Sequence, residues 1–242
     1  MIVGIIPARL NSTRFKRKIL ADILGKPMVV RTADSVKKSK KIENIYIAVD
    51  DKEVFEQLKH HNYDIVMTSN SHISGTERVS EVAKSLNLAK DDIIINIQAD
   101  EPLIDAKLID ELASLLEAEH VKMASVASTC IDKTKLNDTN IVKVYLKKDL
   151  TALDFSRTHN LKNKEIPFKH LGIYGFKKQT LENLVNLPAS KDEISKKLEQ
   201  MRAIENNIQI HMVVTDTNSI SVDTEEDYKN IVLFMKKTAK EA

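Results

Sequence analysis

The sequence has little glycine and only one cysteine. Cys130 alone can form no internal disulfide, and no Cys/His spacing typical of a metal site is present. The five glycines form neither the GxGxxG pattern of a dinucleotide-binding loop nor the GxxxxGK[ST] pattern of a P-loop. Neither of those two nucleotide-binding loops is therefore supported.

The sequence also lacks long apolar runs and an excess of charge of one sign. No run reaches the roughly 18 apolar residues that a membrane span needs, and no basic leader precedes an apolar stretch. The formal net charge is only +2, aromatic residues are 5% and tryptophan is absent, whereas nucleic-acid binders carry a basic excess and stacking aromatics. We therefore expect a cytoplasmic protein with neither a membrane nor a nucleic acid as partner.

The chain does show an alternation of short apolar runs with helical patterns. Hydrophobic residues make up 42% of its 242 residues, enough for a core of ordinary size. Strands separated by helices of this length predict βαβ units and an α/β fold with a mostly parallel, Rossmann-like sheet. The expected strands are 2–6, 44–49, 64–67, 92–98 and 123–128, and the expected helices are 27–39, 51–61, 76–86 and 106–119.

The alternation is less regular after about residue 140. We expect strands at 141–148, 169–178 and 208–215, helices at 194–206 and 224–237, and a loop at 157–168. No linker rich in proline, glycine or serine divides the chain. We therefore predict one α/β domain over 1–242, with a smaller segment inserted at about 140–205. Since VASTCI (126–131) is typical of a strand, Cys130 is predicted to be a small core residue.

Five cations and three small polar residues follow the first predicted strand. They are Arg9, Arg14, Lys16, Arg17 and Lys18, with Asn11, Ser12 and Thr13 among them. In an open parallel sheet, ligands bind outside the carboxyl ends of the strands. Arginine forks pair with phosphate oxygens, and lysine adds a point charge. The loop is therefore predicted to bind a polyphosphate through Arg9, Ser12, Arg14 and Lys18; the alternative is a solvated basic loop.

Two acidic stretches are expected at the same edge of the sheet. QADEP (98–102) follows the predicted central strand, and SVDTEED (221–227) precedes the last helix. Asp100 or Asp223 could each be an ordinary cap. Thr224 and Asp227 resemble a capping box, however, and could cap the last helix without Asp223. Asp223 is then available for another role. Mg²⁺ takes one or two carboxylates together with phosphate oxygens and water. With the basic loop, the two carboxylates predict a metal–triphosphate site.

Eight stretches between residues 5 and 227 resemble one enzyme family, in that family's order. They are IPARLNSTRFKRK, GKPM, SGTER, NIQADEP, FSR, KHLGIYGF, LEQMR and VDTEED. The chain resembles the 3-deoxy-manno-octulosonate (Kdo) cytidylyltransferases, also called CMP-Kdo synthetases. The resemblance implies a nucleotidyltransferase-type sheet and a Mg²⁺-dependent reaction, in which CTP and Kdo give CMP-Kdo and pyrophosphate for lipopolysaccharide synthesis. It also implies a homodimer that uses the segment inserted after residue 140.

The resemblance also implies roles for single residues. The triphosphate would be held by Arg9, Ser12, Arg14 and Lys18, and the rest of CTP by Pro7, Ala8, Ser74, Gly75, Arg78 and Gln98. Mg²⁺ would be bound by Asp100 and Asp223, which form the predicted catalytic group with Arg9 and Lys18. The sugar acid would be surrounded by Arg157, His170, Tyr174, Glu199 and Gln200. Arg157 is expected to bind its carboxylate; the alternative is an ordinary surface ion pair between Arg157 and Glu199.

Four stretches depart from the family's usual pattern. FKRK replaces a sequence close to LPGK, Ala99 replaces glycine in QADEP, SISVDT replaces GTGVDT, and SRTHN replaces SR followed within a few residues by Ile-Pro. The last two are expected on the sugar side. The main alternative is therefore the same chemistry on 8-amino-3,8-dideoxy-octulosonate, or on a nonulosonate such as sialic or pseudaminic acid. A nucleotide-binding protein without catalysis is the alternative from another class, and the presence of both candidate metal carboxylates argues against it.

Overall fold

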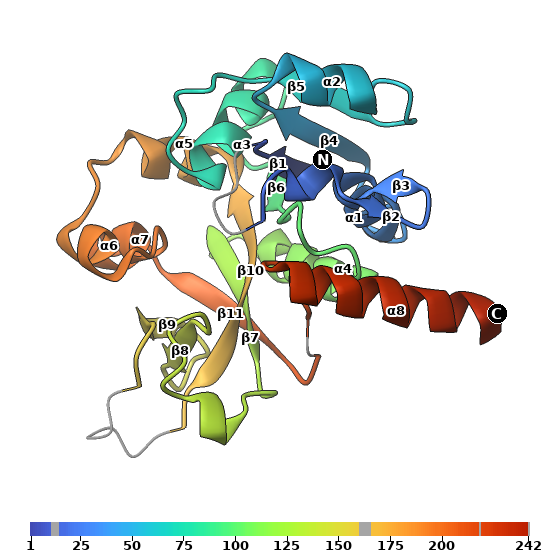
Figure 1. Cartoon of the computed structure of the whole chain (residues 1–242). Helices are drawn as coiled ribbons and strands as arrows, with labels where there is room; N and C mark the ends of the chain where they lie inside the picture. Colours follow the sequence, from blue (N-terminus) through green and yellow to red (C-terminus); the bar gives the residue numbers. More distant parts are fainter. Residues whose placement is uncertain (11–14, 160–165, 218, 242) are drawn as a thin grey trace.

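A computed structural model describes residues 1–10, 15–159, 166–217 and 219–241 of the chain. Figure 1 follows its strands and helices from the blue N-terminus to the red C-terminal helix. The strands are β1 (Ile2–Ala8), β2 (Asp22–Ile23), β3 (Lys26–Pro27), β4 (Asn44–Val49), β5 (Asp64–Met67), β6 (Ile93–Asn96), β7 (Met123–Ser128), β8 (Lys143–Leu146), β9 (Ala152–Ser156), β10 (Phe168–Lys177) and β11 (Ile210–Thr215). The α-helices are α1 (Met28–Val36), α2 (Lys52–Leu58), α3 (Gly75–Ser85), α4 (Ala106–Glu117), α5 (Lys178–Asn186), α6 (Lys191–Lys196), α7 (Met201–Glu205) and α8 (Glu225–Glu241), and the 3-10 turns are η1 (Lys18–Leu20) and η2 (Lys133–Lys135).

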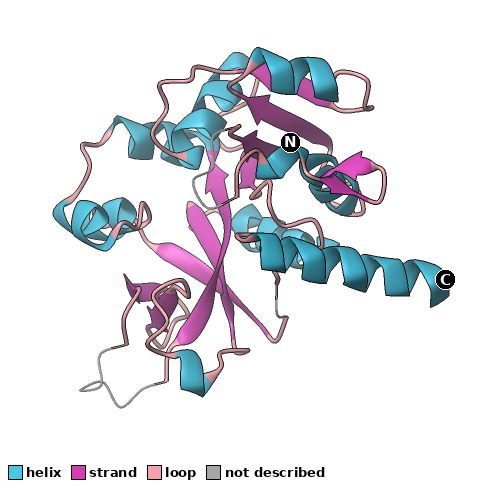
Figure 2. Ribbon diagram, viewed as in Figure 1, coloured by secondary structure: helices cyan, strands magenta, loops and turns pink. Residues whose placement is uncertain are grey.

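One large sheet runs through the described part of the molecule (Figure 2). Its main path has the order β11-β7-β10-β6-β1-β4-β5, with β8 joined to β10 and β9 joined to β8. β1 pairs in parallel with β4 and β6, as β4 does with β5 and β11 with β7. β10 is antiparallel to both β6 and β7. The prediction of an α/β fold with a mostly parallel central sheet is confirmed. β10 is the antiparallel strand on its main path, and the side strands β8 and β9 also pair in antiparallel fashion.

Helices cover both faces of this sheet. Successive residues of β1 alternate between two core clusters, since Ile6 belongs to one and Ile5 to the other. α1, α2 and α4 pack on the first cluster, as Leu112 of α4 does. α3 and α5 pack on the second, as Leu181 of α5 does. Because both faces of β6 are covered in this way, the run 93–95 is apolar at every position.

The contact between α4 and β10 depends on one glycine. A Cβ atom at Gly175 would lie 2.2 Å from Cδ1 of Leu116 and 3.1 Å from Cδ1 of Ile95. Protein interiors are close-packed, so a side chain at this position would push α4 away from the sheet. Glycine therefore allows α4 to pack directly onto β10, in the middle of the sheet.

The helix predicted at 194–206 is divided into α6 and α7. A capping box at Ser190 starts the first helix before residue 194, and Lys197, whose φ is 54°, ends it in the left-handed conformation. Leu198 is buried just after this break. Glu199 and Gln200 consequently lie between two short helices rather than within one.

The prediction that Cys130 lies in the core is wrong. The pairing of β7 with β11 ends at Ser128 and Thr215, and the chain turns away there. Cys130 is exposed, and its thiol donates to the carbonyl of Asp216 at 2.8 Å. The strand-like composition of VASTCI continues beyond Ser128, but the pairing with β11 does not. The composition therefore predicted a buried Cys130 where none of the described strands covers it.

The segment predicted as an insertion, about 140–205, contains β8, β9 and β10. β8 and β9 lie beside the main path of the sheet, whereas β10 returns to its centre. The hairpin of β2 and β3, strand β9 and helix α5 are not predicted from the sequence. The boundaries of the insertion and the assignment of 1–242 to one domain stay predictions.

Within the described ranges, no helix combines the length and the apolar composition that crossing a bilayer requires.

Candidate active site

Two cavities adjoin at the carboxyl ends of β1 and β6, the edge at which open parallel sheets bind ligands. The first, of about 680 Å³, is lined from β1, the start of α3 and the loop after β6. The second, of about 610 Å³, is lined from β10, residues 140–142 and the segment between α6 and α7. Gln98, Asp223 and residues 197–199 line both cavities, so ligands in the two would meet there.

Most residues predicted to bind the nucleotide line the first cavity. These are Pro7, Arg9, Lys18, Ser74, Gly75, Arg78 and Gln98, together with Asp100 and Asp223. Ala8 is instead fully buried in the core beneath it. Ser12 and Arg14 lie outside the described residues. The binding roles of these residues stay predictions.

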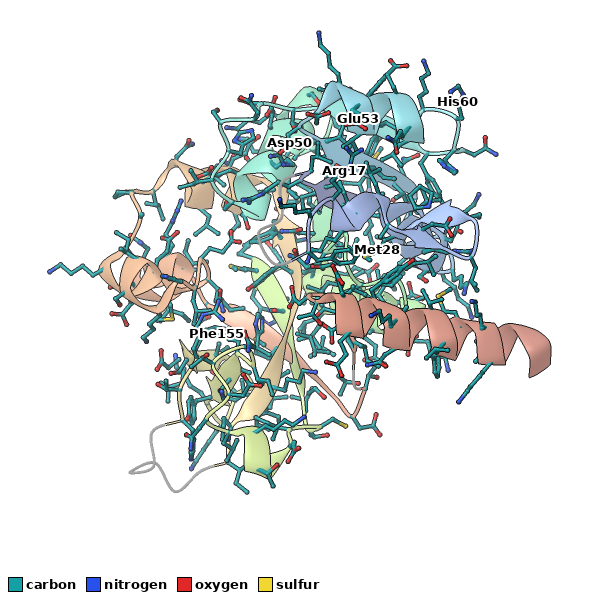
Figure 3. All side chains as sticks on the ribbon, viewed as in Figure 1. Arg17, Met28, Asp50, Glu53, His60 and Phe155 are labelled. Atoms are coloured by element: carbon teal, nitrogen blue, oxygen red, sulfur yellow. The ribbon has the colours of Figure 1, made fainter. Side chains whose placement is uncertain are left out.

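The cations of the first loop have different partners. Arg9 and Lys18 line the first cavity, and Arg9 also donates to the carbonyl of Ile73 at 3.3 Å. Arg17 turns toward α2 and forms an ion pair with Glu53 (Figure 3). The hydrogen bond and the charge of Glu53 raise the pKa of Arg17. One end of the loop is thus tied to α2, while two of its cations line the cavity.

Lys18 joins the two predicted metal ligands. Its Nζ donates to the carboxylate of Asp100 and, at 3.2 Å, to Oδ1 of Asp223. The predicted capping box is confirmed, because Thr224 N donates to Oδ2 of Asp227 at 2.8 Å and Asp227 N donates to Oγ1 of Thr224 at 3.2 Å. The carboxylate of Asp223 is therefore directed to Lys18 instead of capping α8. Two carboxylates that converge on one ammonium mark a position suited to a cation.

A magnesium ion fits this pair of carboxylates. The described residues contain no group of three or more His, Cys, Asp or Glu side chains that could hold a metal by themselves. Mg²⁺ needs no such group, since it usually takes one or two carboxylates and completes its shell with phosphate oxygens and water. Asp100 and Asp223 supply that number of ligands beside a cavity lined by cations, and the ammonium of Lys18 stands in for the bound cation.

Arg78 of α3 is held by a buried ion pair. Its Nη2 donates to Oδ2 of Asp50 at 3.0 Å, and its Nη1 donates to the hydroxyl of Thr68 and to the carbonyl of Ser69. The Arg78 side chain is only 2% exposed, and burial lowers its pKa. Oδ1 of Asp50 accepts from Leu10 N at 3.1 Å. Asp50 therefore links the basic loop to α3, and the Arg78 guanidinium is engaged within the cavity wall.

The start of α3 also favours an anion in the first cavity. Ser74 caps the helix by accepting from Glu77 N at 3.1 Å, and Gly75 lies against Pro7, whose Cγ would be 3.4 Å from a Cβ. The unpaired N–H groups and the dipole of a helix N-terminus attract negative charge. Together with Arg9 and Lys18, this end of the helix makes the first cavity suitable for a polyphosphate.

All residues predicted to surround the sugar acid line the second cavity. They are Arg157, His170, Tyr174, Glu199 and Gln200. Arg157 follows β9, two residues belong to β10, and the other two lie between α6 and α7. Their roles toward a sugar stay predictions, but the structure brings all of them to one cavity.

The alternative for Arg157 was a surface ion pair with Glu199. No such pair is present among the described residues. Nη1 of Arg157 donates to the carbonyl of Thr139 at 3.0 Å. Its Nε and Nη2 donate to the carbonyls of Lys196 and Lys197 at 3.3 and 3.2 Å. The guanidinium thus holds the carbonyl end of α6, where cations are favourable, and adds positive charge to the cavity wall.

Glu199 brings an unsatisfied oxygen into this site. Its Oε2 is buried and has no hydrogen-bond partner among the described residues. Burial, together with the charge of Glu199, raises the pKa of Tyr174 well above its ordinary value. A buried carboxylate oxygen without a donor is costly. A ligand with several hydroxyl groups would supply the missing donor.

His170 is neutral. Burial lowers the pKa of His170 to about 3. Its ring stands edge-on to Phe155, with centroids 5.0 Å apart and an interplanar angle of 78°. Phe155 is labelled in the lower part of Figure 3. Nε2 of His170 lies 2.9 Å from Oγ of Ser125 on β7.

Sequence reasoning missed three charged residues of the site. Glu101 lines the second cavity, accepts from the hydroxyl of Ser219 at 2.9 Å, and has its pKa raised to about 7 by burial and by the charge of Asp100. Lys169 lines the same cavity, and burial lowers its pKa. Asp50 is the third. A signal existed for two of them: Glu101 lies inside QADEP, and Asp50 directly follows the strand 44–49.

The two cavities define a class of enzyme. The first can hold a polyphosphate between cations and a helix N-terminus, and the second can hold a polar acceptor. A cation position lies beside Asp223, which lines both. A nucleotide in the first cavity could thus react with an acceptor in the second. The fold and the site are those of a nucleotidyltransferase.

Comparisons with known proteins narrow this class. Residues 3–210 match the family described as Cytidylyltransferase. A 3-deoxy-manno-octulosonate cytidylyltransferase of a Nitratiruptor species is 41% identical over 240 residues, which cover 94% of this chain and 97% of the relative. An 8-amino-3,8-dideoxy-manno-octulosonate cytidylyltransferase of a Shewanella species is 36% identical over 232 residues, which cover 93% of this chain and 95% of the relative.

A solved structure agrees with these relatives. The structure of CMP:2-keto-3-deoxy-manno-octonic acid synthetase complexed with CTP matches with a TM-score of 0.90 and 30% identity, covering 98% of this chain and 99% of that one. The chain belongs to the 3-deoxy-manno-octulosonate cytidylyltransferase family, the CMP-Kdo synthetases, as its motifs indicated. It is therefore a cytidylyltransferase.

Proposed function

We propose that this enzyme transfers CMP from CTP to the anomeric hydroxyl of Kdo, giving CMP-Kdo and pyrophosphate for lipopolysaccharide synthesis. The observation that carries the proposal is the pair of adjoining cavities, which meet beside Asp223 and Gln98. The relatives named for this reaction and the match to a synthetase complexed with CTP support it.

In this reaction the anomeric oxygen attacks the α-phosphorus of CTP and pyrophosphate leaves on the opposite side. The approaching groups are both negatively charged, so the residues must offset repulsion and hold the two ligands in line. Arg9 and Lys18 supply positive charge from the first cavity, and Arg157 supplies it from the second. No covalent enzyme intermediate is needed, and the exposed Cys130 takes no part.

Dependence on Mg²⁺ is part of the proposal. Asp100 and Asp223 would hold the ion, which when bound neutralises charge on the phosphates and orients the in-line attack. Lys18, which now bridges the two carboxylates, would then be available to the phosphate oxygens. Asp100→Asn should lower turnover far more than it weakens sugar binding, and EDTA should abolish turnover. Normal turnover in EDTA or in the variant would contradict the metal scheme.

A second acceptor has support of its own. Relatives that are 36% identical to this chain are named for the 8-amino sugar, so 8-amino-3,8-dideoxy-octulosonate is the alternative substrate for the same reaction. The two acids share the carboxylate and the anomeric centre and differ at C8. The described lining of the second cavity carries charges of both signs, since Glu101 and Lys169 lie in the same wall, so charge in this part of the wall does not select between the two acids.

The deciding experiment is a substrate panel. CTP is incubated with Kdo, with 8-amino-Kdo or with sialic acid, and pyrophosphate release is measured for each. We expect release with Kdo. Release with 8-amino-Kdo alone would favour the alternative. CTP binding without release for any acid would favour the non-catalytic nucleotide-binding protein.

Arg157→Ala should raise the KM for the sugar acid much more than that for CTP, and equal effects on both would show that Arg157 does not bind the acid.

We also propose a homodimer formed through the inserted segment. Leu150 and Leu153, just before and within β9 of this segment, are 50% and 52% exposed. Apolar side chains exposed on this segment favour burial against a second copy. Light scattering should give twice the 27.4 kDa of one chain, and a value of one chain would refute the dimer. Because the reaction consumes CTP, we place it in the cytoplasm.

A further inference from the structure

β10 contains an irregularity at the wall of the second cavity. Leu171 pairs with Val126 of β7, but the next pair is Tyr174 with Ser125, so two residues of β10 have no counterpart on β7. Bulges of this kind often lie beside active sites, where they redirect side chains. The carbonyl of Ile173, inside the bulge, accepts from the Ser125 hydroxyl at 2.8 Å.

The same serine is bonded to His170. Oγ of Ser125 lies 2.9 Å from Nε2 of His170, and both residues are buried. A serine hydroxyl has one proton. That proton is directed to the carbonyl of Ile173, which can only accept. The hydrogen bond between Ser125 and His170 must therefore use a proton on Nε2 of the imidazole.

The other ring nitrogen is then an acceptor. Because burial lowers the pKa of His170 to about 3, the ring carries one proton at neutral pH. With that proton on Nε2, Nδ1 keeps its lone pair. Nδ1 has no hydrogen-bond partner among the described residues, and His170 lines the second cavity. The ring is held in place by Phe155 and Tyr174, whose centroids are 5.0 and 5.4 Å away.

We propose that Ser125 is a positioning residue, which holds His170 as the Nε2–H tautomer so that Nδ1 accepts a hydrogen bond from a hydroxyl group of the sugar acid. The inference rests on the proposed function, because it concerns the acceptor of that reaction. A neutral acceptor cannot bind a carboxylate oxygen, which has no proton to donate. His170 thus accepts a hydrogen bond from a hydroxyl group, and the carboxylate is left to the cations of the wall. This division sets the orientation of the sugar acid in the cavity.

The tautomer can be observed directly, without catalysis. The wild-type protein is labelled with ¹⁵N at its seven histidines, and His170 is assigned by comparison with His170→Gln in a two-bond ¹H–¹⁵N NMR spectrum at pH 7. We expect an unprotonated Nδ1 and a protonated Nε2, and a change in the Nδ1 shift when Kdo is added. A protonated Nδ1, a doubly protonated ring, or an Nδ1 shift insensitive to every acid that the enzyme accepts would overturn the proposal.

Two matched variants provide the kinetic test. Ser125→Ala removes the partner of His170, whereas Ser128→Ala removes a hydroxyl that is equally buried on the same strand but donates to the carbonyl of Thr217 at 2.7 Å. Ser125→Ala should raise the KM for the sugar acid about three- to tenfold, the value of one neutral hydrogen bond, and leave the KM for CTP unchanged. Its NMR spectrum should show a mixture of tautomers. Ser128→Ala should leave both the KM for the sugar acid and the tautomer of His170 unchanged.

The outcomes separate this proposal from the proposed function. Equal rises of both KM values in Ser125→Ala, or the same KM for the acid in the two variants, would overturn the positioning role. Failure of the enzyme with every acid of the substrate panel would overturn the proposed function instead, and the tautomer of the wild-type protein would still be measured.

Discussion

The neutral state of His170 makes the stability of the protein depend on pH. Burial lowers the pKa of His170 from its ordinary 6.5 to about 3. Below pH 6.5 the unfolded chain takes up a proton at this residue and the folded protein does not, so the free energy of unfolding must fall as the pH decreases toward 3. His170→Gln cannot be protonated and should lack this part of the pH dependence.

The size of the change in unfolding free energy follows from the pKa shift of His170. Each pKa unit corresponds to about 1.4 kcal/mol, so between pH 7 and pH 5 the wild type should lose about 2 kcal/mol more than the variant. That difference corresponds to about 4–8 °C in melting temperature for a chain of this length. The pKa of His211 is also lowered by burial, but this histidine is present in both proteins and its effect cancels.

Urea denaturation at pH 7, 6 and 5 measures the difference. The variant is expected to be less stable than the wild type at pH 7, because it fills the site less well, and to approach the wild type as the pH falls. A stability difference that stays constant across the three pH values would refute the reasoning, since it would mean that His170 takes up its proton in the folded protein as easily as in the unfolded one.

Three further substitutions test other parts of the site. Asp50→Ala leaves the buried guanidinium of Arg78 without its carboxylate and should cost about 3 kcal/mol or more in urea denaturation; a loss below about 1 kcal/mol would show that the ion pair is not needed. Lys18→Met should raise the KM for CTP about tenfold or more, since a hydrogen bond to a charged group is worth about 1.5–3 kcal/mol, and calorimetry that finds unchanged CTP binding would exclude a contact with the phosphates. Cys130→Ser should leave turnover unchanged, because this residue is exposed and lies outside both cavities; loss of turnover would reveal a role for the thiol.

The sequence by itself determined the parts of the protein that depend on local patterns. Apolar runs separated by amphipathic helices were enough to predict β1, β4 and β6 as strands of a mostly parallel α/β sheet. Because ligands bind at the carboxyl ends of such strands, the basic loop after β1 and Asp100 after β6 could be assigned to one site. Lys18 and Asp100 are in contact in the structure, although 82 residues separate them in the chain.

Only the tertiary structure decided how distant segments combine. Nothing in KHLGIYGF indicates that β10 lies antiparallel between β6 and β7, because strand order depends on which pairings bury the most surface over the whole chain. Gly175 makes that position possible by its close contact with α4. The ion pair of Arg78 with Asp50 and the hydrogen bond that His170 donates to Ser125 depend in the same way on neighbours 28 and 45 residues away. Periodicity indicates which face of an element is buried, but the partner that covers it is set by the three-dimensional packing.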